Sequence, residues 1–161
     1  MKLIELGESL KLIEAPDIIK VPNLESLVLK NCINLRRIHP SNGIHKKLTF
    51  LNLYGCKNLT SLPSMFEMER LTEFNLCFCS KITKIPEFRR NMKRVHSLYL
   101  NCTAITTVPK SIEHLIAPCN LHLGGTAITT LPTSIEHLTA LCSLHLSGCK
   151  NLVRLANTIL I

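Results

Sequence analysis

Aromatic side chains are scarce in this sequence: among 161 residues there is no Trp, and Phe and Tyr together make up 4%. The core must therefore be built from branched aliphatic side chains, and the chain carries 28 Leu and 16 Ile. No apolar run approaches the roughly 18 residues that a membrane helix needs, so we expect no membrane span. Glu5 and Glu8 interrupt the only stretch that would serve as a secretory signal, so we expect an intracellular protein.

Acidic residues are also few, since 11 Asp and Glu face 19 Lys and Arg and leave a formal charge of +8. The hydrophobic fraction of 46% nevertheless excludes a disordered chain. We expect the protein in the cytoplasm, with the nucleus as the alternative. Thiols stay reduced there, so the 8 Cys are interpreted as packing groups and not as a disulfide framework.

An internal repeat organises the whole chain. Successive prolines lie 23 or 24 residues apart, at positions 16, 40, 63, 86, 109 and 132. The shared pattern is L-x-x-L-x-L-x-x-C-x-x-L-x-x-L-P, and its units start near positions 1, 24, 48, 71, 95, 118 and 141. This pattern fits the leucine-rich-repeat signature, which has a period of about 20–29 residues. The sequence predicts one domain, 1–161, of about seven repeats.

The predicted fold class is an α/β repeat, a leucine-rich-repeat solenoid shaped as a horseshoe arc. Each L-x-L triplet alternates at period two, so it predicts a short parallel strand with one buried face and one open, concave face. Stacked coils supply the core, because one coil cannot bury its own apolar edge. Irregular or short helical segments are expected on the convex side, where 111–115 and 134–138 follow a proline with a Ser cap.

Four cysteines share one slot, three residues after the last strand leucine. We interpret Cys32, Cys56, Cys79 and Cys149 as structural, because a small weak donor there can bond a backbone carbonyl of the adjoining coil. Ser9, Thr103 and Thr126 take the same slot in other repeats. The remaining thiols are Cys77, Cys102, Cys119 and Cys142. The last two share a column, so a disulfide between them is geometrically conceivable, although a reducing cell disfavours it.

The open face of the predicted strands supplies the candidate site. Its columns place polar and aromatic side chains one rung apart, and we predict a protein-binding surface made of Asn52, Tyr54, Asn75, Tyr99, Asn101, His122 and His145. The two histidines also raise the alternatives of a shared metal or a pH-sensitive pair, but no third ligand of the right type lies nearby. We predict no catalytic, cofactor-binding or metal-binding residues and no small-molecule substrate.

Basic residues crowd one repeat. The only acid among them is Glu87, and Lys46 and Lys47 lie on the same side of the repeat period. The clustered basic residues are Lys81, Lys84, Arg89, Arg90, Lys93 and Arg94. The sequence leaves two interpretations open, a solvated convex loop and a surface that docks an acidic protein. Nucleic acid is not expected as a partner, because its binding usually adds stacking aromatics to the cations.

The ladder Cys, the period and the regular Pro together resemble the leucine-rich repeats of plant intracellular immune receptors. These receptors combine a TIR domain, a nucleotide-binding domain and leucine-rich repeats, and they include the group similar to the tobacco mosaic virus resistance protein N. The likeness covers essentially the whole chain. It is carried by Ala15-Pro16-Asp17 followed by Val21-Pro22-Asn23-Leu24-Glu25, by Ile38-His39-Pro40-Ser41, by 48–63, and by a shorter unit with Thr at 98–105 that recurs at 121–131. F-box leucine-rich repeats also use Cys, but they run nearer 26 residues and lack the regular Pro.

The resemblance implies a non-catalytic interaction module in innate immunity. Its partner would be a pathogen effector, a guarded host protein or the receptor's own nucleotide-binding domain, which the repeats hold inactive. The alternative is a stand-alone intracellular scaffold or adaptor in signalling. The sequence contains no TIR or nucleotide-binding segment, so the NAD cleavage and nucleotide exchange of those domains are assigned to no residue of this chain. Both ends lie inside the repeat pattern, which predicts an uncapped fragment, and Pro118 replaces an expected Leu, which predicts one damaged coil.

Overall fold

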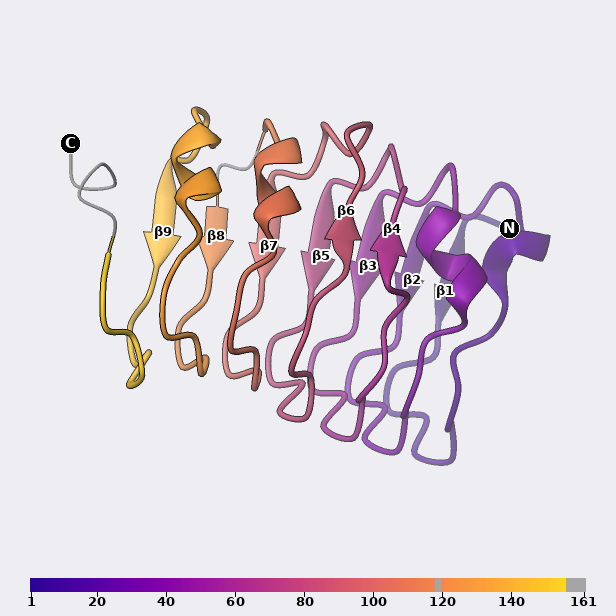
Figure 1. The fold of residues 1–161 in the computed structure, drawn as a ribbon. Coiled ribbons are helices and arrows are strands. Elements are labelled where there is room, and N and C mark those ends of the chain that lie inside the picture. Colours follow the sequence, from indigo (N-terminus) through magenta and orange to yellow (C-terminus); the bar gives the residue numbers. More distant parts are fainter. Residues whose placement is uncertain (118–119, 156–161) are drawn as a thin grey trace.

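The fold is a stack of coils, each contributing one three-residue strand to a parallel sheet. The computed structural model describes residues 1–117 and 120–155. Within them a seven-stranded sheet runs in chain order, apart from two short strands that form a separate pair (Figure 1). The sheet comprises β1 (Leu3–Glu5), β2 (Ser26–Val28), β3 (Phe50–Asn52), β5 (Glu73–Asn75), β7 (Ser97–Tyr99), β8 (Asn120–His122) and β9 (Ser143–His145).

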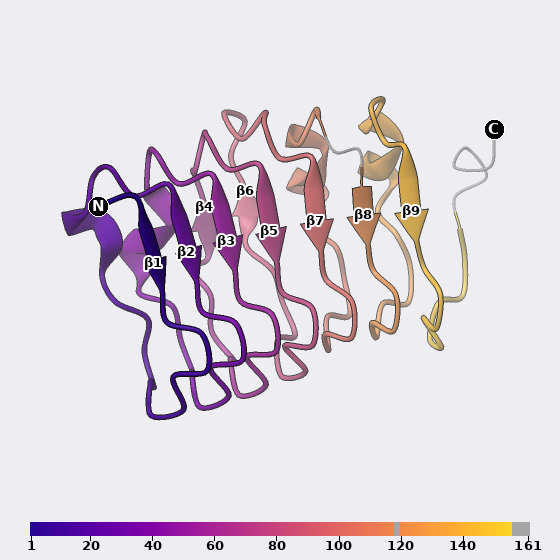
Figure 2. The ribbon, with the colours of Figure 1, turned by 180° about the vertical axis from the view of Figure 1, so that it is seen from behind.

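The L-x-L triplets build the core as the sequence predicts. The middle residue of each strand points inward, and the register aligns Leu27 with Leu51 and Leu51 with Phe74. These side chains, like Leu53 and Leu76 just after their strands, are at most 2% exposed. One face of the sheet therefore covers the core and the other stays open (Figure 2). The predicted leucine-rich-repeat solenoid is confirmed.

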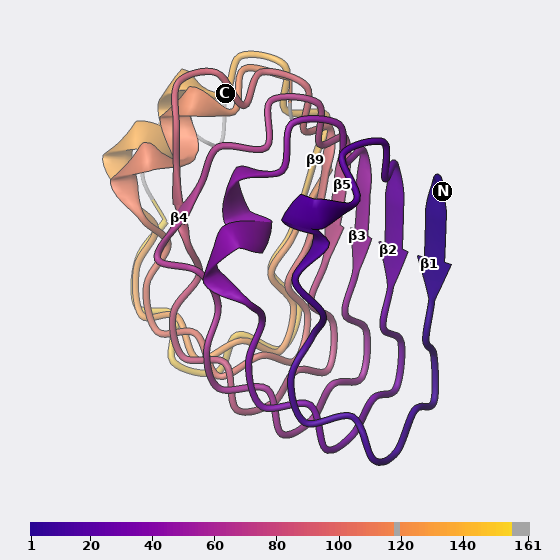
Figure 3. The ribbon, with the colours of Figure 1, turned by 90° about the vertical axis from the view of Figure 1, so that its right-hand side faces the viewer.

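The return side of each coil is less regular than the sheet. Short 3₁₀ turns lie at both ends of this side, opposite the sheet (Figure 3), while the middle coils use a two-stranded parallel pair (Figure 1). The turns are η1 (Ile18–Lys20), η2 (Pro40–Ile44), η3 (Lys110–His114) and η4 (Thr133–His137), and the paired strands are β4 (Met65–Phe66) and β6 (Glu87–Phe88). The short helical segments expected around 111–115 and 134–138 are therefore present, as η3 and η4.

The predicted serine caps of these turns are wrong. Pro109 and Pro132 occupy the N-cap positions with extended backbone, and neither turn has a side-chain cap hydrogen bond. Ser111 lies inside η3 instead, where its hydroxyl accepts from the N–H of Phe88 (3.0 Å) and donates to Glu87 of the preceding coil. Ser134, in the corresponding place of η4, is buried and is the one such side-chain oxygen without a partner in the described part of the chain.

Where cysteine fills its repeat slot after the strand, it links its coil to the one before. Burial raises the pKa of the Cys32 thiol, so the sulfur keeps the proton that it donates. The expectation of a bond to the adjoining coil is confirmed at four places: Cys32 Sγ to Leu6 O (3.0 Å), Cys56 Sγ to Leu29 O (3.1 Å), Cys79 Sγ to Leu53 O (3.0 Å) and Cys149 Sγ to Leu123 O (3.0 Å).

Threonine in the same slot makes a different bond. Thr103 donates to Leu100 O (2.8 Å) and Thr126 to Leu123 O (2.7 Å), so each hydroxyl bonds a carbonyl three residues earlier in its own coil. Thr thus holds the bend after the strand but adds no bond to the preceding coil. Pro118 and Cys119 lie outside the described residues, so the structure does not describe the predicted damage at Pro118 or the pairing of Cys119 with Cys142.

The residue just before this slot takes a left-handed backbone in every coil. Glycine meets the requirement at Gly55, where φ is +71°, and also at Gly125 and Gly148. In the other coils a non-glycine residue adopts the same conformation, with φ between 56° and 62°: Glu8, Asn31, Phe78 and Cys102. The chain therefore tolerates strain in four turns to keep one bend.

No helix in the described parts of the chain has the length and apolar character required to cross a membrane.

Core truncation tests the register of the stack. Leu76 is fully buried, so Leu76→Ala removes packed atoms and leaves a cavity, and we expect the free energy of unfolding to fall by roughly 2–5 kcal/mol. The matched control is Leu10→Ala, because Leu10 is 54% exposed, and its cost should stay below about 1 kcal/mol. Urea denaturation measures both. Equal midpoints for the Leu76 variant and the parent would contradict the register.

The two equivalent serines predict opposite effects on stability. Ser134→Ala removes a buried hydroxyl that lacks a partner, so the free energy of unfolding should rise by about 1 kcal/mol. Ser111→Ala strips the Phe88 N–H of its acceptor, so it should cost about 1–2 kcal/mol. Urea unfolding of both variants checks the pair, and a loss of stability of the same size in each would rule out this difference between η3 and η4.

Candidate functional site: the open face of the sheet

The third residue of each strand forms one column across the open face. Parallel pairing places Glu5, Val28, Asn52, Asn75, Tyr99, His122 and His145 on successive rungs. Five of the seven predicted site residues therefore share one column, as the alternation of the strands predicts. Tyr54 and Asn101 belong to the neighbouring column, two residues further along their coils. All seven are at least partly exposed.

The side-chain oxygens of the asparagines in the predicted site accept hydrogen bonds from backbone N–H groups. The side-chain oxygen of Asn52 accepts from the N–H of Tyr54, and that of Asn75 from the N–H of Cys77, both at 2.9 Å. Asn101 instead accepts from the N–H of Gly124 in the next coil (2.9 Å). These oxygens hold the chain where it leaves the strand, so the asparagines first serve the fold and offer a partner mainly their amide nitrogens.

Three rings stack across successive coils and form the most distinctive part of the face, here called the aromatic stack. The ring centroids of Tyr99 and His122 lie 4.8 Å apart with planes tilted by 44°. Those of His122 and His145 lie 4.2 Å apart with planes only 13° from parallel. One rung of a parallel sheet is about 4.8 Å, which suits ring stacking, so the repeat itself creates this strip.

A second group of rings lies nearer the start of the chain. Tyr54 packs edge-on against Phe78 with centroids 5.3 Å apart, and the Lys30 ammonium sits 5.5 Å from the centre of the Tyr54 ring. Phe78 is 43% exposed and escaped sequence reasoning, because no other coil has an aromatic side chain in this slot. Its left-handed backbone turns the ring toward Tyr54.

The first residue of each strand adds a column that sequence reasoning missed. It shares the open face with the third residue and runs through Leu3, Ser26, Phe50, Glu73, Ser97, Asn120 and Ser143. The period-two alternation was the available signal, since residues two apart on a strand share a face. Burial raises the pKa of the Glu73 carboxyl, and His96 partly opposes that shift.

Two effects disfavour the charged form of His122. Burial lowers the pKa of His122, and the neighbouring His145 lowers it further, because a second positive charge at this distance is repelled. The alternative of a shared metal lacks ligands: no group of three or more His, Cys, Asp or Glu side chains suited to a metal ion occurs within residues 1–117 and 120–155.

A Ser–His–Asp group on the return side has the wrong order for nucleophilic catalysis. Ser41 Oγ donates to Asp17 Oδ1 (2.6 Å) and also faces His39 Nδ1 (2.7 Å). In a catalytic triad the histidine stands between the other two and takes the serine proton, whereas here the proton points to the carboxylate. The bond lowers the pKa of Asp17, which also caps η1 by accepting from the N–H of Ile19. The group therefore joins η1 to η2.

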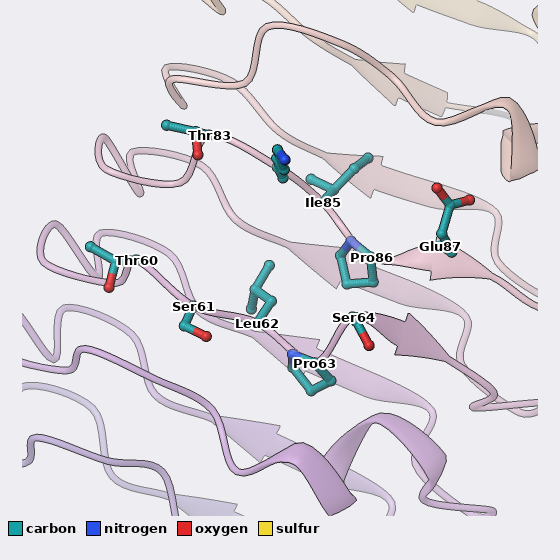
Figure 4. A pocket seen from close by; sticks show the side chains of 10 residues that line it. Thr60, Ser61, Leu62, Pro63, Ser64, Thr83, Ile85, Pro86 and Glu87 are labelled. Atoms are coloured by element: carbon teal, nitrogen blue, oxygen red, sulfur yellow. The ribbon is translucent and has the colours of Figure 1, made fainter.

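A hollow on the outer surface follows the same repeat (Figure 4). Equivalent residues of two coils face each other across it, with Leu62 beside Ile85 and Pro63 beside Pro86. Hydroxyl groups of Thr60, Ser61, Ser64 and Thr83 line the rest, with Lys84 and Glu87 as its charged members. The hollow is the seam between two return legs, so the open face stays the stronger candidate for binding.

Protonation of His122 gives a test of the aromatic stack. Its ring should titrate below the ordinary value of 6.5, so as pH falls the unfolded chain takes up the proton first and this histidine's contribution to stability is lost from about pH 6.5 downward. NMR titration of the ring protons measures the midpoint. His145→Gln should raise it toward 6.5, and the control His137→Gln on the outer face should not. A His122 midpoint at or above 6.5 in the parent would contradict the stack.

Comparison with known proteins agrees with this architecture. A family model described as Leucine Rich Repeat matches residues 47–68. TMV resistance protein N from Nicotiana glutinosa is 38% identical over 63 residues, which are 39% of this chain but only 6% of that protein.

One solved structure shows the likeness in three dimensions. The leucine-rich repeat domain of the type III effector XopL superposes with a TM-score of 0.72 at 22% identity, over 93% of this chain and 53% of that one. An internalin from Listeria monocytogenes matches at a TM-score of 0.43 and 14% identity, over 94% of this chain and 53% of its own. This chain thus spans about half the length of the XopL domain, and its fold is that of a leucine-rich-repeat solenoid.

Proposed function

We propose that this leucine-rich-repeat chain is a non-catalytic protein-interaction module of a plant innate immune receptor. The observation that carries the proposal is the aromatic stack of Tyr99, His122 and His145 on an open sheet face. Tyrosine is enriched at protein interfaces and at their energetic hot spots, because it buries a large rigid surface and keeps a polar tip. The partner is a protein whose surface fits across the concave side of several coils.

The role in immunity rests on similarity to a resistance protein. The 63 residues that are 38% identical to TMV resistance protein N support a defence role, alongside the cysteine slot and the 23–24-residue period. In this role the open face recognises a pathogen effector or a guarded host protein, and it contacts the receptor's own nucleotide-binding domain in the resting state. The receptor acts in the cytoplasm or the nucleus.

A stand-alone scaffold that assembles signalling proteins is the second candidate. The observation in its favour is the open face itself, which serves an adaptor equally well. Sequencing the native transcript separates the two. An in-frame TIR segment and a nucleotide-binding phosphate loop support the receptor, whereas a transcript with intact polar capping repeats and neither segment supports the scaffold.

Substitution of a residue on the open face should weaken the binding of a partner protein. Tyr99→Ala removes the first ring of the aromatic stack but no buried core atom, so the fold should persist while partner binding weakens roughly tenfold or more. The partners to measure are those selected by the parent chain in a two-hybrid screen of effectors and host proteins, with affinities then determined by titration on purified proteins.

The control for this variant is Thr83→Ala, which alters an exposed side chain at the outer hollow and leaves the open face intact. Circular dichroism of all three proteins should coincide. If the Tyr99 variant keeps the parent affinity for every selected partner while the Thr83 variant loses it, binding lies on the outer surface and the proposed face is wrong.

A further inference from the structure

Basic side chains also gather away from the open face, along the edge where the strands begin. Three successive coils make a turn there just before β3, β5 and β7, and the turns lie one rung apart because the strands that follow are in register. We call the cations of these turns the basic edge. Its members are Lys46, Lys47, Arg70, Lys93 and Arg94, and all are exposed.

The core forces these side chains outward. In the second turn Met68 and Leu71 are both buried, and the N–H of Leu71 donates to Met68 O (3.0 Å), so the two residues between them must face solvent. The other two turns have the same form, since each places two residues between a pair of buried ones. Those buried pairs are His45 with Leu48 and Met92 with Val95.

The buried His45 also fixes the first of these turns. Its Nδ1 accepts from the N–H of Leu48 (3.1 Å), which leaves Nε2 to donate to Val21 O in the preceding coil (3.0 Å). The turn is therefore tied both to its own strand and to its neighbour. These two bonds hold in place the backbone that carries Lys46 and Lys47.

Cations from two coils converge on one hollow. Arg70, Lys93 and Arg94 line it together with Glu69 and Asn91. Within residues 1–117 and 120–155 none of the five basic-edge residues takes part in a salt bridge, and Lys47 Nζ donates only to the neutral Asn23 (2.6 Å). Five positive charges thus face one acid of the same turns, Glu69.

The structure divides the basic segment 81–94 that the sequence presents as one cluster. Arg89 pairs with Glu67 (3.1 Å), and Lys81 donates to Asn58 (2.7 Å) on the loop side of the coils. Lys93 and Arg94 instead join Arg70 of the preceding coil. Grouping by space therefore replaces grouping by sequence: Lys93 and Arg94 belong with the cations of the two preceding coils at the strand-start edge.

We propose that the basic edge docks an acidic protein segment through that segment's carboxylates. Arginine binds carboxylates with two parallel hydrogen bonds, and two of the five cations are arginines that line the same hollow. Successive turns are about 4.8 Å apart, close to the 5.4 Å pitch of an α-helix. A helix with acids one turn apart presents its carboxylates at nearly the spacing of the cations.

Nucleic acid fits this edge less well. Single-stranded nucleic acid is bound by cations alternating with aromatic platforms on which bases stack. The rings of this chain are largely engaged with each other, as Tyr99, His122 and His145 are on the open face and Phe66 with Phe74 are in the core. Charge complementarity to carboxylates, without stacking, is what the edge offers.

Charge reversal tests the proposal with a defined probe. The probe is a fluorescein-labelled 20-residue helical peptide with glutamates one turn apart, titrated by fluorescence anisotropy at 50 and 200 mM salt. We expect the parent to bind it with salt-sensitive affinity and R70E/R94E to lose at least tenfold. The matched control K57E/K150E makes the same change in net charge at exposed residues outside the edge and should lose less than threefold.

Two further arms keep the test decisive. R70Q/R94Q removes the charges without reversing them, so the affinity for the peptide should fall by an intermediate factor. Its circular dichroism spectrum should match that of the parent. A labelled oligo-dT strand replaces the peptide in the second arm. The proposal is overturned if the parent does not bind the peptide below 1 mM, if both charge reversals lose equally, or if oligo-dT binds more tightly than the peptide and depends on the same arginines.

Discussion

Hydrogen bonding between successive coils sets the place of almost every other group in this molecule. The N–H that follows each strand donates to the next coil, as from Leu53 to Asn75 O and from Leu76 to Tyr99 O, both at 2.8 Å. Four cysteine thiols add a bond to the preceding coil on the buried side. Because each coil is tied to its neighbours in one register, residues 23 or 24 apart in sequence become neighbours in space.

Both proposed surfaces follow from that register. On the open face it places Tyr99, His122 and His145 at a spacing where rings stack, and at the strand-start edge it brings Arg70 beside Lys93 and Arg94. Neither surface is built by a special loop. Each arises from the residue types that occupy one slot of the repeat over several coils, so a leucine-rich repeat can change its partner while its core stays the same.

Sequence reasoning recovers what the repeat dictates and loses what depends on individual side chains. The regular prolines and the L-x-L triplets suffice for the strands, the buried face and the column through Tyr99 and His122. They do not predict the bend at Phe78, because a left-handed turn normally signals glycine, nor the position of Ser134, because a serine after proline looks like a cap. Return legs vary between 3₁₀ turns and β4 with β6, since several short conformations can close the same coil.

The central claim is that the coil register creates the aromatic stack, and NOE spectroscopy of the isolated chain tests it most directly. Ring protons of His122 should show cross-peaks to the rings of both Tyr99 and His145, whose centroids lie 4.8 and 4.2 Å away. Rings two rungs apart, those of Tyr99 and His145, should show none. Cross-peaks between Tyr99 and His145 without any to His122 would contradict the register and the binding surface built on it.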